Sequence, residues 1–76
     1  MPESRFLVYT REDCALCDAF VAELAELLPA FEVRDVDANS TTRRRYGLKV
    51  PVLACEGSVV CYGRLDRAAI ERLTRD

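Results

Sequence analysis

The chain has 76 residues, of which 50% are hydrophobic and 32% charged, and its 11 basic and 13 acidic side chains give a net charge of −2. This composition is typical of a globular protein, and the length predicts a single domain over residues 1–76. The near balance of charge argues against nucleic-acid binding, and the absence of histidine excludes imidazole catalysis.

The first half of the chain changes from a strand pattern to a helix pattern and back. Arg5–Thr10 contains a short run of strand-favouring residues and predicts a buried strand. From Ala15 the apolar residues follow helical spacing up to Pro29, which ends the helix. Alternation of apolar and charged side chains over Phe31–Val36 predicts a second strand. The residues expected on the apolar face of the first helix are Leu16, Phe20, Leu24, Leu27 and Leu28.

The second half predicts a short helix, a hairpin and a last helix. Residues 39–46 form the short helix, with its cap at 39–40, and Gly47 ends it. Residues 50–55 and 58–62 read as two strands joined by a two-residue turn. Asp66 caps the last helix.

The resulting order is strand, helix, strand, helix, strand, strand, helix (βαβαββα). A strand–helix–strand opening favours a right-handed crossover and a parallel pair, and the closing hairpin adds antiparallel strands. The sequence therefore predicts an α/β protein with a mixed four-stranded sheet flanked by helices.

The protein is expected to be cytoplasmic and to have no contact with a membrane. Its apolar stretches are too short to cross a bilayer, and the N-terminal residues lack the basic start and apolar stretch of a secretory signal. Four cysteines in that compartment are expected to be redox-active, metal-binding or buried, and not joined in structural disulfides.

Cys14 and Cys17 form a C-x-x-C pair where the turn after the first strand enters the helix. Helical spacing puts both sulfurs on one side, close enough to interchange between dithiol and disulfide. The helix N-terminus favours an anion, and in such pairs the pKa of the first thiol falls from about 8.5 to about 3.5–7.5. Cys17, one turn further on, is expected to be shielded and to remain a thiol. The pattern predicts that Cys14 attacks a disulfide and that Cys17 resolves the mixed disulfide.

Three segments carry a resemblance to a known family. Tyr9–Cys17 resembles the strand-to-helix signature of glutaredoxins, Lys49–Pro51 is similar to their Thr-Val-Pro with its cis proline, and Gly63 with Asp66 resembles their Gly-Gly-x-Asp segment. The predicted element order is also that of glutaredoxins. The resemblance therefore implies a thioredoxin-like fold and dithiol–disulfide oxidoreductase activity.

The resemblance also implies roles for single residues. Cys14 would be the nucleophile and Cys17 the resolving thiol. The Val50 backbone, beside a cis Pro51, would form hydrogen bonds with an extended substrate strand. Two further residues match positions near glutathione in the family, Arg11 at a carboxylate and Asp66 at the γ-glutamyl end.

The likeness to the family is incomplete near its glutathione positions. Ala15 replaces the proline after the first cysteine, Lys49 replaces threonine, and Tyr62 replaces a glycine. A disulfide-containing protein or another small thiol is therefore as good a candidate substrate as glutathione. We expect no bound prosthetic group, glutathione at most as a thiol co-substrate, and a monomer.

Two other functions remain open at this point. The first is a non-enzymatic binding module that recognises an extended peptide along the Val50–Pro51 edge, with incidental cysteines. The second is a structural or metal-handling role for the thiols, although the spacing of the cysteines does not suit a zinc site. A two-residue hairpin turn would send the sulfurs of Cys55 and Cys61 to opposite faces of the sheet. A three-residue turn would put them on one face as diagonal neighbours, about 7–8 Å apart at the alpha carbons, which is too far for a disulfide. Both are therefore expected to be buried thiols.

Overall fold

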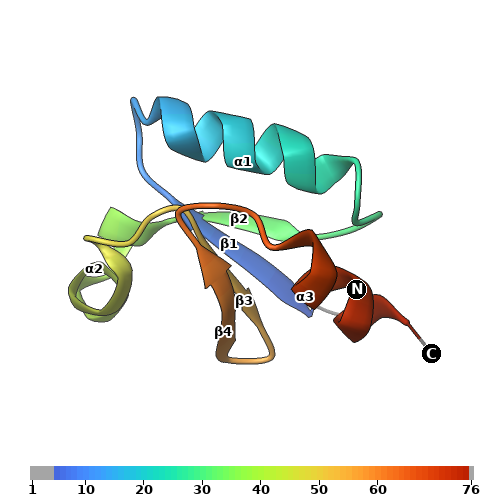
Figure 1. Cartoon of the computed structure of the whole chain (residues 1–76). Coiled ribbons are helices and arrows are strands. Elements are labelled where there is room, and N and C mark those ends of the chain that lie inside the picture. Colours follow the sequence, from blue (N-terminus) through green and yellow to red (C-terminus); the bar gives the residue numbers. More distant parts are fainter. Residues whose placement is uncertain (1–4, 76) are drawn as a thin grey trace.

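The computed structural model describes residues 5–75, and a mixed four-stranded sheet forms its centre (Figure 1). The strands are β1 (Phe6–Thr10), β2 (Glu32–Asp35), β3 (Val52–Cys55) and β4 (Ser58–Tyr62). Their order across the sheet is β2-β1-β3-β4, with β2 parallel to β1 and the other two pairings antiparallel. The mixed sheet predicted from the sequence is confirmed, and with its helices it has the thioredoxin-like fold.

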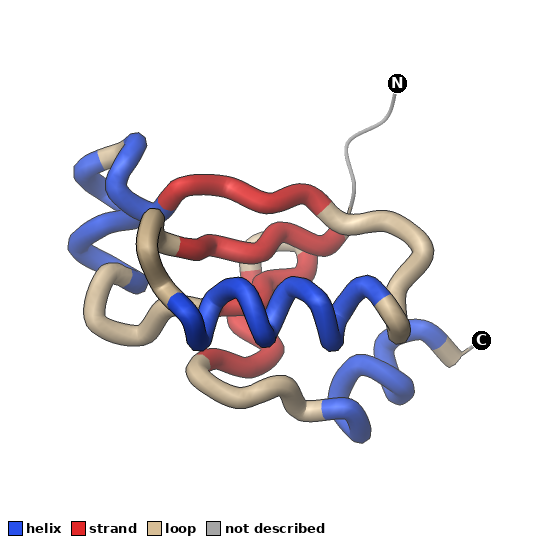
Figure 2. The backbone as a smooth tube through the Cα atoms, turned by 90° about the horizontal axis from the view of Figure 1, so that it is seen from above, coloured by secondary structure: helices blue, strands red, loops and turns tan. Residues whose placement is uncertain are grey.

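Three helices and one 3₁₀ turn connect these strands. They are α1 (Ala15–Ala25), the 3₁₀ helix η1 (Val36–Ala38), α2 (Ser40–Tyr46) and α3 (Arg67–Thr74). In the view from above, the chain that leaves β4 runs beside α1 before it enters α3 (Figure 2). Both α1 and α3 pack on the same face of the sheet, whereas α2 contacts the other face through stacked Tyr9 and Tyr46 rings 4.9 Å apart.

The main core lies between the sheet and the pair α1 and α3. Alternation along β1 directs Phe6 and Val8 to this face, where they meet Phe20 and Leu24 of α1 and Ile70 of α3. Side chains of these five residues are at most 5% exposed. Burial of such apolar surface is the main stabilising term in a chain of this size.

The face that α1 buries differs from the predicted one. Cys17, Phe20 and Leu24 point into the core, whereas Leu16 is 55% exposed. Successive helical residues are about 100° apart, so a helix that turns Cys17 toward the sheet turns Leu16 sideways. The prediction of Leu16 as a core residue was wrong.

Several helices and strands are also shorter in the structure than the sequence predicted. Helix α1 ends at Ala25, because Glu26 and Leu27 close a tighter turn before Pro29, whose ring disfavours helical backbone in the residue before it. Leu28 is buried all the same. Strand β2 covers only Glu32–Asp35, and its Val33 is 49% exposed because β2 is an edge strand. Strand β3 begins at Val52, two residues later than predicted.

The β3–β4 hairpin contains an irregularity that the sequence did not reveal. Its turn has two residues, as predicted, but a register shift between Leu53 and Ala54 pairs Leu53 with Cys61. An extra residue in one strand moves every later side chain to the opposite face. Cys61 therefore lies on the same face as Cys55, as a diagonal neighbour, and the prediction of opposite faces was wrong. Both remain free thiols.

No helix within residues 5–75 is both long enough and apolar enough to span a membrane.

Candidate functional site

The sheet register brings the predicted site segments to one end of the molecule. Thr10 at the end of β1 lies beside Asp35 at the end of β2, and Tyr9 lies beside Val52 at the start of β3. Val52 in turn pairs with Tyr62 at the end of β4. The C-x-x-C turn that follows β1, the residues that precede β3 and those that follow β4 therefore meet at this end.

Cys14 is the N-cap of α1 and is half-buried. Its Sγ accepts a hydrogen bond from the backbone N–H of Cys17 at 3.1 Å. Asp13 holds the preceding turn with a left-handed φ of 57°, a conformation that Asp tolerates better than most residues. Here a sulfur takes the place of the usual N-cap hydroxyl or carboxylate. The hydrogen bond from the N–H is stronger when the sulfur is a thiolate than when it is a thiol.

Cys17 lies one turn inside α1 and is 1% exposed. The pKa of Cys17 is raised to about 11, first by burial and then by the hydrogen bond with the Cys14 side chain. A backbone hydrogen bond with Arg11 acts against this pKa rise but does not cancel it. Cys17 is therefore the shielded thiol of the pair, as predicted.

The Val50–Pro51 peptide bond is cis, as the resemblance implied. Pro51 is buried, and its carbonyl accepts a hydrogen bond from the Gly63 N–H at 2.8 Å, which ties the segment before β3 to the segment after β4. Val50 lies before Pro51 and outside β3, and its backbone makes no hydrogen bond with another described residue. A free edge of this kind can accept an extended strand.

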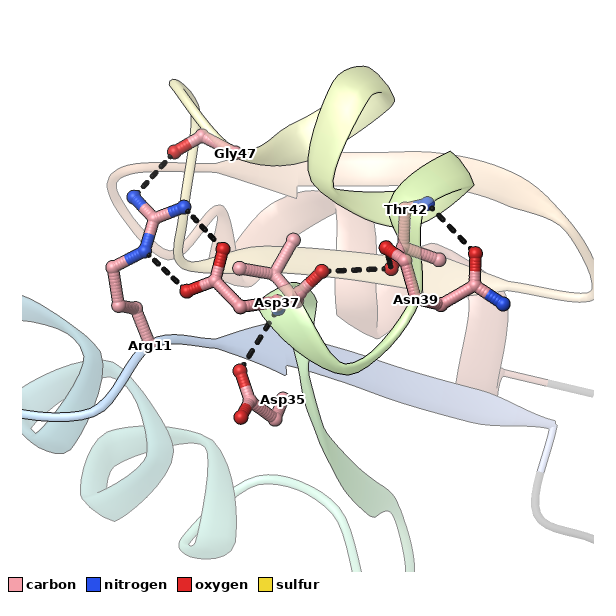
Figure 3. A network of polar contacts seen from close by, with 7 residues as sticks. Arg11, Asp35, Asp37, Asn39, Thr42 and Gly47 are labelled. Atoms are coloured by element: carbon pink, nitrogen blue, oxygen red, sulfur yellow. Dashed lines mark hydrogen bonds and ion pairs between the residues drawn. The ribbon is translucent and has the colours of Figure 1, made fainter.

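Arg11, which precedes the C-x-x-C pair, is held in a hydrogen-bond network with Asp37 and Gly47 (Figure 3). Its Nε and Nη2 donate to the two carboxylate oxygens of Asp37 at 2.8 and 3.0 Å, and its Nη1 donates to the Gly47 carbonyl at 2.8 Å. The hydrogen bond raises the pKa of Arg11 and lowers the pKa of Asp37. The guanidinium predicted to meet a substrate carboxylate thus already has a carboxylate partner.

Neighbouring side chains hold that partner in place (Figure 3). Asp35 caps η1 by accepting the Asp37 N–H at 2.9 Å, and Asn39 caps α2 by accepting the Thr41 N–H at 2.7 Å. The Thr42 hydroxyl donates to the Val36 carbonyl at 2.8 Å. Sequence reasoning missed the role of Asp37, because it lies 26 positions after Arg11 and that separation leaves no local signal.

Gly47 ends α2 as predicted, but with φ −55° rather than the left-handed backbone of a typical glycine cap. A Cβ here would overlap the Arg43 carbonyl oxygen and lie 3.2 Å from Arg11 Nη2. The glycine is therefore needed for the close approach of the Arg11 network to the end of α2.

Asp66 lies three residues beyond Gly63 and acts as the N-cap of α3. Its Oδ1 accepts the Ala69 N–H at 3.0 Å. The predicted cap is confirmed. The other predicted site residues gather around the C-x-x-C turn, whereas Asp66 lies where the connection from β4 enters α3.

The hairpin cysteines have different surroundings. Burial raises the pKa of Cys61, and the Cys55 Sγ is 3.7 Å from Nη2 of Arg5. Across residues 5–75, no group of three or more His, Cys, Asp or Glu side chains is arranged to hold a metal ion.

Comparison with known proteins gives results that agree with this geometry. Residues 5–74 match the family described as Glutaredoxin-like domain (DUF836). A search of curated proteins finds no match.

The solved structures that are similar to this chain include the following two. One is the X-ray structure of Northeast Structural Genomics target protein XcR50 from X. campestris, with 31% identity, a TM-score of 0.73, and coverage of 90% of this chain and 92% of that one. The other is the holo form of glutaredoxin C1 from Populus tremula x tremuloides, with 14% identity, a TM-score of 0.60, and coverage of 95% and 77%. At this identity the second likeness bears on the fold alone.

Proposed function

The chain belongs to the glutaredoxin-like domain family, and we propose that it is a thiol–disulfide oxidoreductase that works through Cys14 and Cys17. The observation that carries the proposal is the asymmetry of the pair. Cys14 is partly accessible and receives an N–H bond at a helix N-terminus, whereas Cys17 is buried with a raised pKa.

In the first step, the Cys14 thiolate attacks one sulfur of a substrate disulfide. The substrate S–S bond breaks, one substrate sulfur leaves as a thiolate that takes up a proton, and the other becomes joined to Cys14. The Cys17 N–H and the α1 dipole support the anionic form of Cys14 before the attack. The free edge at Val50 would pair with the substrate backbone during this step.

In the second step, Cys17 loses its proton and attacks Cys14 Sγ, which releases the second substrate thiol and leaves a Cys14–Cys17 disulfide. The negative charge of Cys14 and its hydrogen bond contribute to the raised pKa of Cys17. Both contributions end when Cys14 enters the mixed disulfide, so the pKa of Cys17 falls when its thiolate is needed.

Two equivalents of a monothiol, or one equivalent of a dithiol, would return the disulfide to the dithiol and become oxidised to a disulfide in turn. Glutathione is one donor of this class, and a protein dithiol is another. The disulfide substrate would be a protein or a small thiol compound, and we place the reaction in the cytoplasm, where such donors keep thiols reduced.

Trapping the mixed disulfide tests this function. The Cys17→Ser variant, incubated with a disulfide substrate, should accumulate one adduct on Cys14 that dithiothreitol removes, because no resolving thiol remains. The wild type should release the product, and the Cys14→Ser variant should form no adduct at residue 17. Absence of an adduct, or equal labelling of Cys55 and Cys61, would contradict the proposal.

The second candidate is a peptide-binding module, favoured by the unpaired Val50 backbone beside buried Pro51. Such a module would bind extended peptides equally well in wild type and Cys14→Ser protein, without exchange. The trapping experiment therefore separates the two functions.

A further inference from the structure

Arg11 lies close enough to the dithiol to influence what binds there. It stands three residues before Cys14, in the turn between β1 and α1. The pKa of Arg11 is raised, mainly by its hydrogen bond with Asp37 and to a smaller extent by the negative charge of Cys14. A guanidinium in this position would suit a carboxylate on a substrate that Cys14 attacks, because its planar N–H groups can bind both carboxylate oxygens.

Both edges of the Arg11 guanidinium are already covered (Figure 3). Nε and Nη2, which form the side edge, donate to the two oxygens of Asp37 at 2.8 and 3.0 Å. Nη1 donates to the Gly47 carbonyl at 2.8 Å, and a Cβ on Gly47 would lie 3.2 Å from Nη2, so Gly47 covers the end edge between Nη1 and Nη2. Neither edge therefore offers two N–H groups to a second carboxylate.

Asp37 is well held at the side edge. Its backbone N–H donates to the Asp35 side chain at 2.9 Å, and the neighbouring Val36 is fully buried. Because the Asp37 carboxylate belongs to the same chain, its effective concentration at Arg11 exceeds that of a dissolved competitor. A substrate carboxylate that displaced it would form two hydrogen bonds only by breaking two, so it would gain little binding energy.

We propose that Asp37 determines specificity at this site, because it holds Arg11 so that a carboxylate on the substrate gains no bidentate contact beside Cys14. The inference rests on the proposed exchange at Cys14 and specifies its substrate class as disulfides that are accepted without a carboxylate contact at Arg11. Other exposed cations, such as Arg64, still attract anions in general, so the role of Asp37 is measured as a change in preference between two substrates.

The test uses the Cys17→Ser protein and two mixed disulfides of pyridine-2-thiol. One carries glutathione, and the other carries glutathione diethyl ester, which has the same peptide without the carboxylate charges. The Cys14 thiolate attacks the glutathione sulfur, the S–S bond breaks, and the glutathione becomes joined to Cys14. The pyridine-2-thiolate leaves, takes up a proton and is followed as pyridine-2-thione by absorbance. The measured quantity is the ratio of the glutathione rate to the ester rate.

We expect Asp37→Asn in this background to raise the ratio about fivefold, because an amide cannot accept both Arg11 hydrogen bonds and the guanidinium becomes available to the substrate. Glu12→Gln removes a carboxylate that is exposed and makes no ion pair with another described residue, and it should raise the ratio by about twofold at most. Arg11→Gln combined with Asp37→Asn keeps the net charge of the parent protein and should return the ratio to within about twofold of it.

Arg11→Gln alone tests the same inference with Asp37 intact, and it should lower the ratio by no more than about twofold. A several-fold fall would show that Arg11 already binds the substrate carboxylate, which would overturn the inference. An unchanged ratio in Asp37→Asn, or an equal rise in Glu12→Gln, would also overturn it while leaving the proposed function intact. If neither mixed disulfide reacts faster with the protein than with free cysteine, the proposed function itself fails, and this inference with it.

Discussion

The chain carries two pairs of cysteines, and the sulfurs of the two pairs have different surroundings in the folded structure. Cys14 and Cys17 lie at the start of a helix, where a backbone N–H points at a partly exposed sulfur. Cys55 and Cys61 lie on neighbouring strands, on the face covered by α1 and α3, as part of the core or packed against it. The chemistry of the residue type is the same in both pairs, so the difference comes from the backbone around them.

Under the proposed function, exposure and hydrogen bonding, and not the proximity of two sulfurs, decide which thiols exchange. The bulge brings the hairpin sulfurs to one face, but burial raises the pKa of Cys61 and Cys55 is 7% exposed. A thiol that stays protonated and covered is a poor nucleophile. In the helix pair, only the inner sulfur is covered, which under the proposed function leaves one sulfur to attack and one to resolve.

The largest expected effect comes from removing single cysteines. Cys14→Ser should lower the rate of peptide disulfide reduction by about 1,000-fold or more, because the nucleophile is lost. Cys55→Ala and Cys61→Ala should stay within about threefold of wild type, because neither sulfur takes part. The measurement is steady-state reduction of a peptide disulfide with an excess of thiol donor.

Circular dichroism of each variant controls for folding in that series. If a folded Cys61→Ala protein lost activity as completely as Cys14→Ser, the contrast between the two pairs would be wrong.

A smaller effect is expected in the stability of the reduced protein at alkaline pH. The pKa of Cys17 is about 11 in the folded chain against an ordinary value of 9.0, so between these pH values the unfolded chain binds fewer protons and unfolding becomes easier as pH rises. Two pKa units correspond to about 2–3 kcal/mol by pH 11. Cys17→Ala should remove this part of the alkaline loss, as measured by urea unfolding at pH 7 to 11.

Cys61→Ala is the matched comparison for that experiment, since Cys61 also has a pKa raised by burial but forms no part of the helix pair. It should remove a smaller share of the alkaline loss than Cys17→Ala does. Equal slopes in wild type and Cys17→Ala would show that the inner sulfur ionises as freely in the folded chain as in the unfolded one.

Those features of the fold and of the candidate site that depend on local spacing could be predicted from the sequence. The C-x-x-C at a strand–helix junction, the Asn39 and Asp66 caps and the two-residue hairpin turn are each set by residues a few positions apart. Element order and the fold followed from these signals.

What could not be predicted depends on tertiary contacts. The bulge that reorients Cys61 follows from how β4 fits β3, and no residue type in the hairpin marks it. The exposure of Leu16 depends on how α1 is rotated over the sheet, which a repeat of apolar residues fixes only to within one position. The pairing of Arg11 with Asp37 joins two turns that only the finished sheet brings together.

The smallest expected effect concerns that last contact, which supports the turn before Cys14. The ordinary pKa of an aspartate is 3.8, and the hydrogen bond from Arg11 lowers the pKa of Asp37 below it. The unfolded chain therefore binds more protons than the folded chain below about pH 4, so the stabilisation by this pair is complete above that pH and is lost as pH falls through the folded pKa.

Asp37→Asn should reduce this loss of stability at acid pH, as measured by urea unfolding between pH 2 and 6. Arg11→Lys should retain part of it, because lysine keeps the charge but cannot bond both carboxylate oxygens and the Gly47 carbonyl in the same planar geometry. An unchanged acid slope in both variants would mean that the Arg11–Asp37 pair is too well solvated to hold the turn, and the position of Cys14 would then depend on its own helix cap.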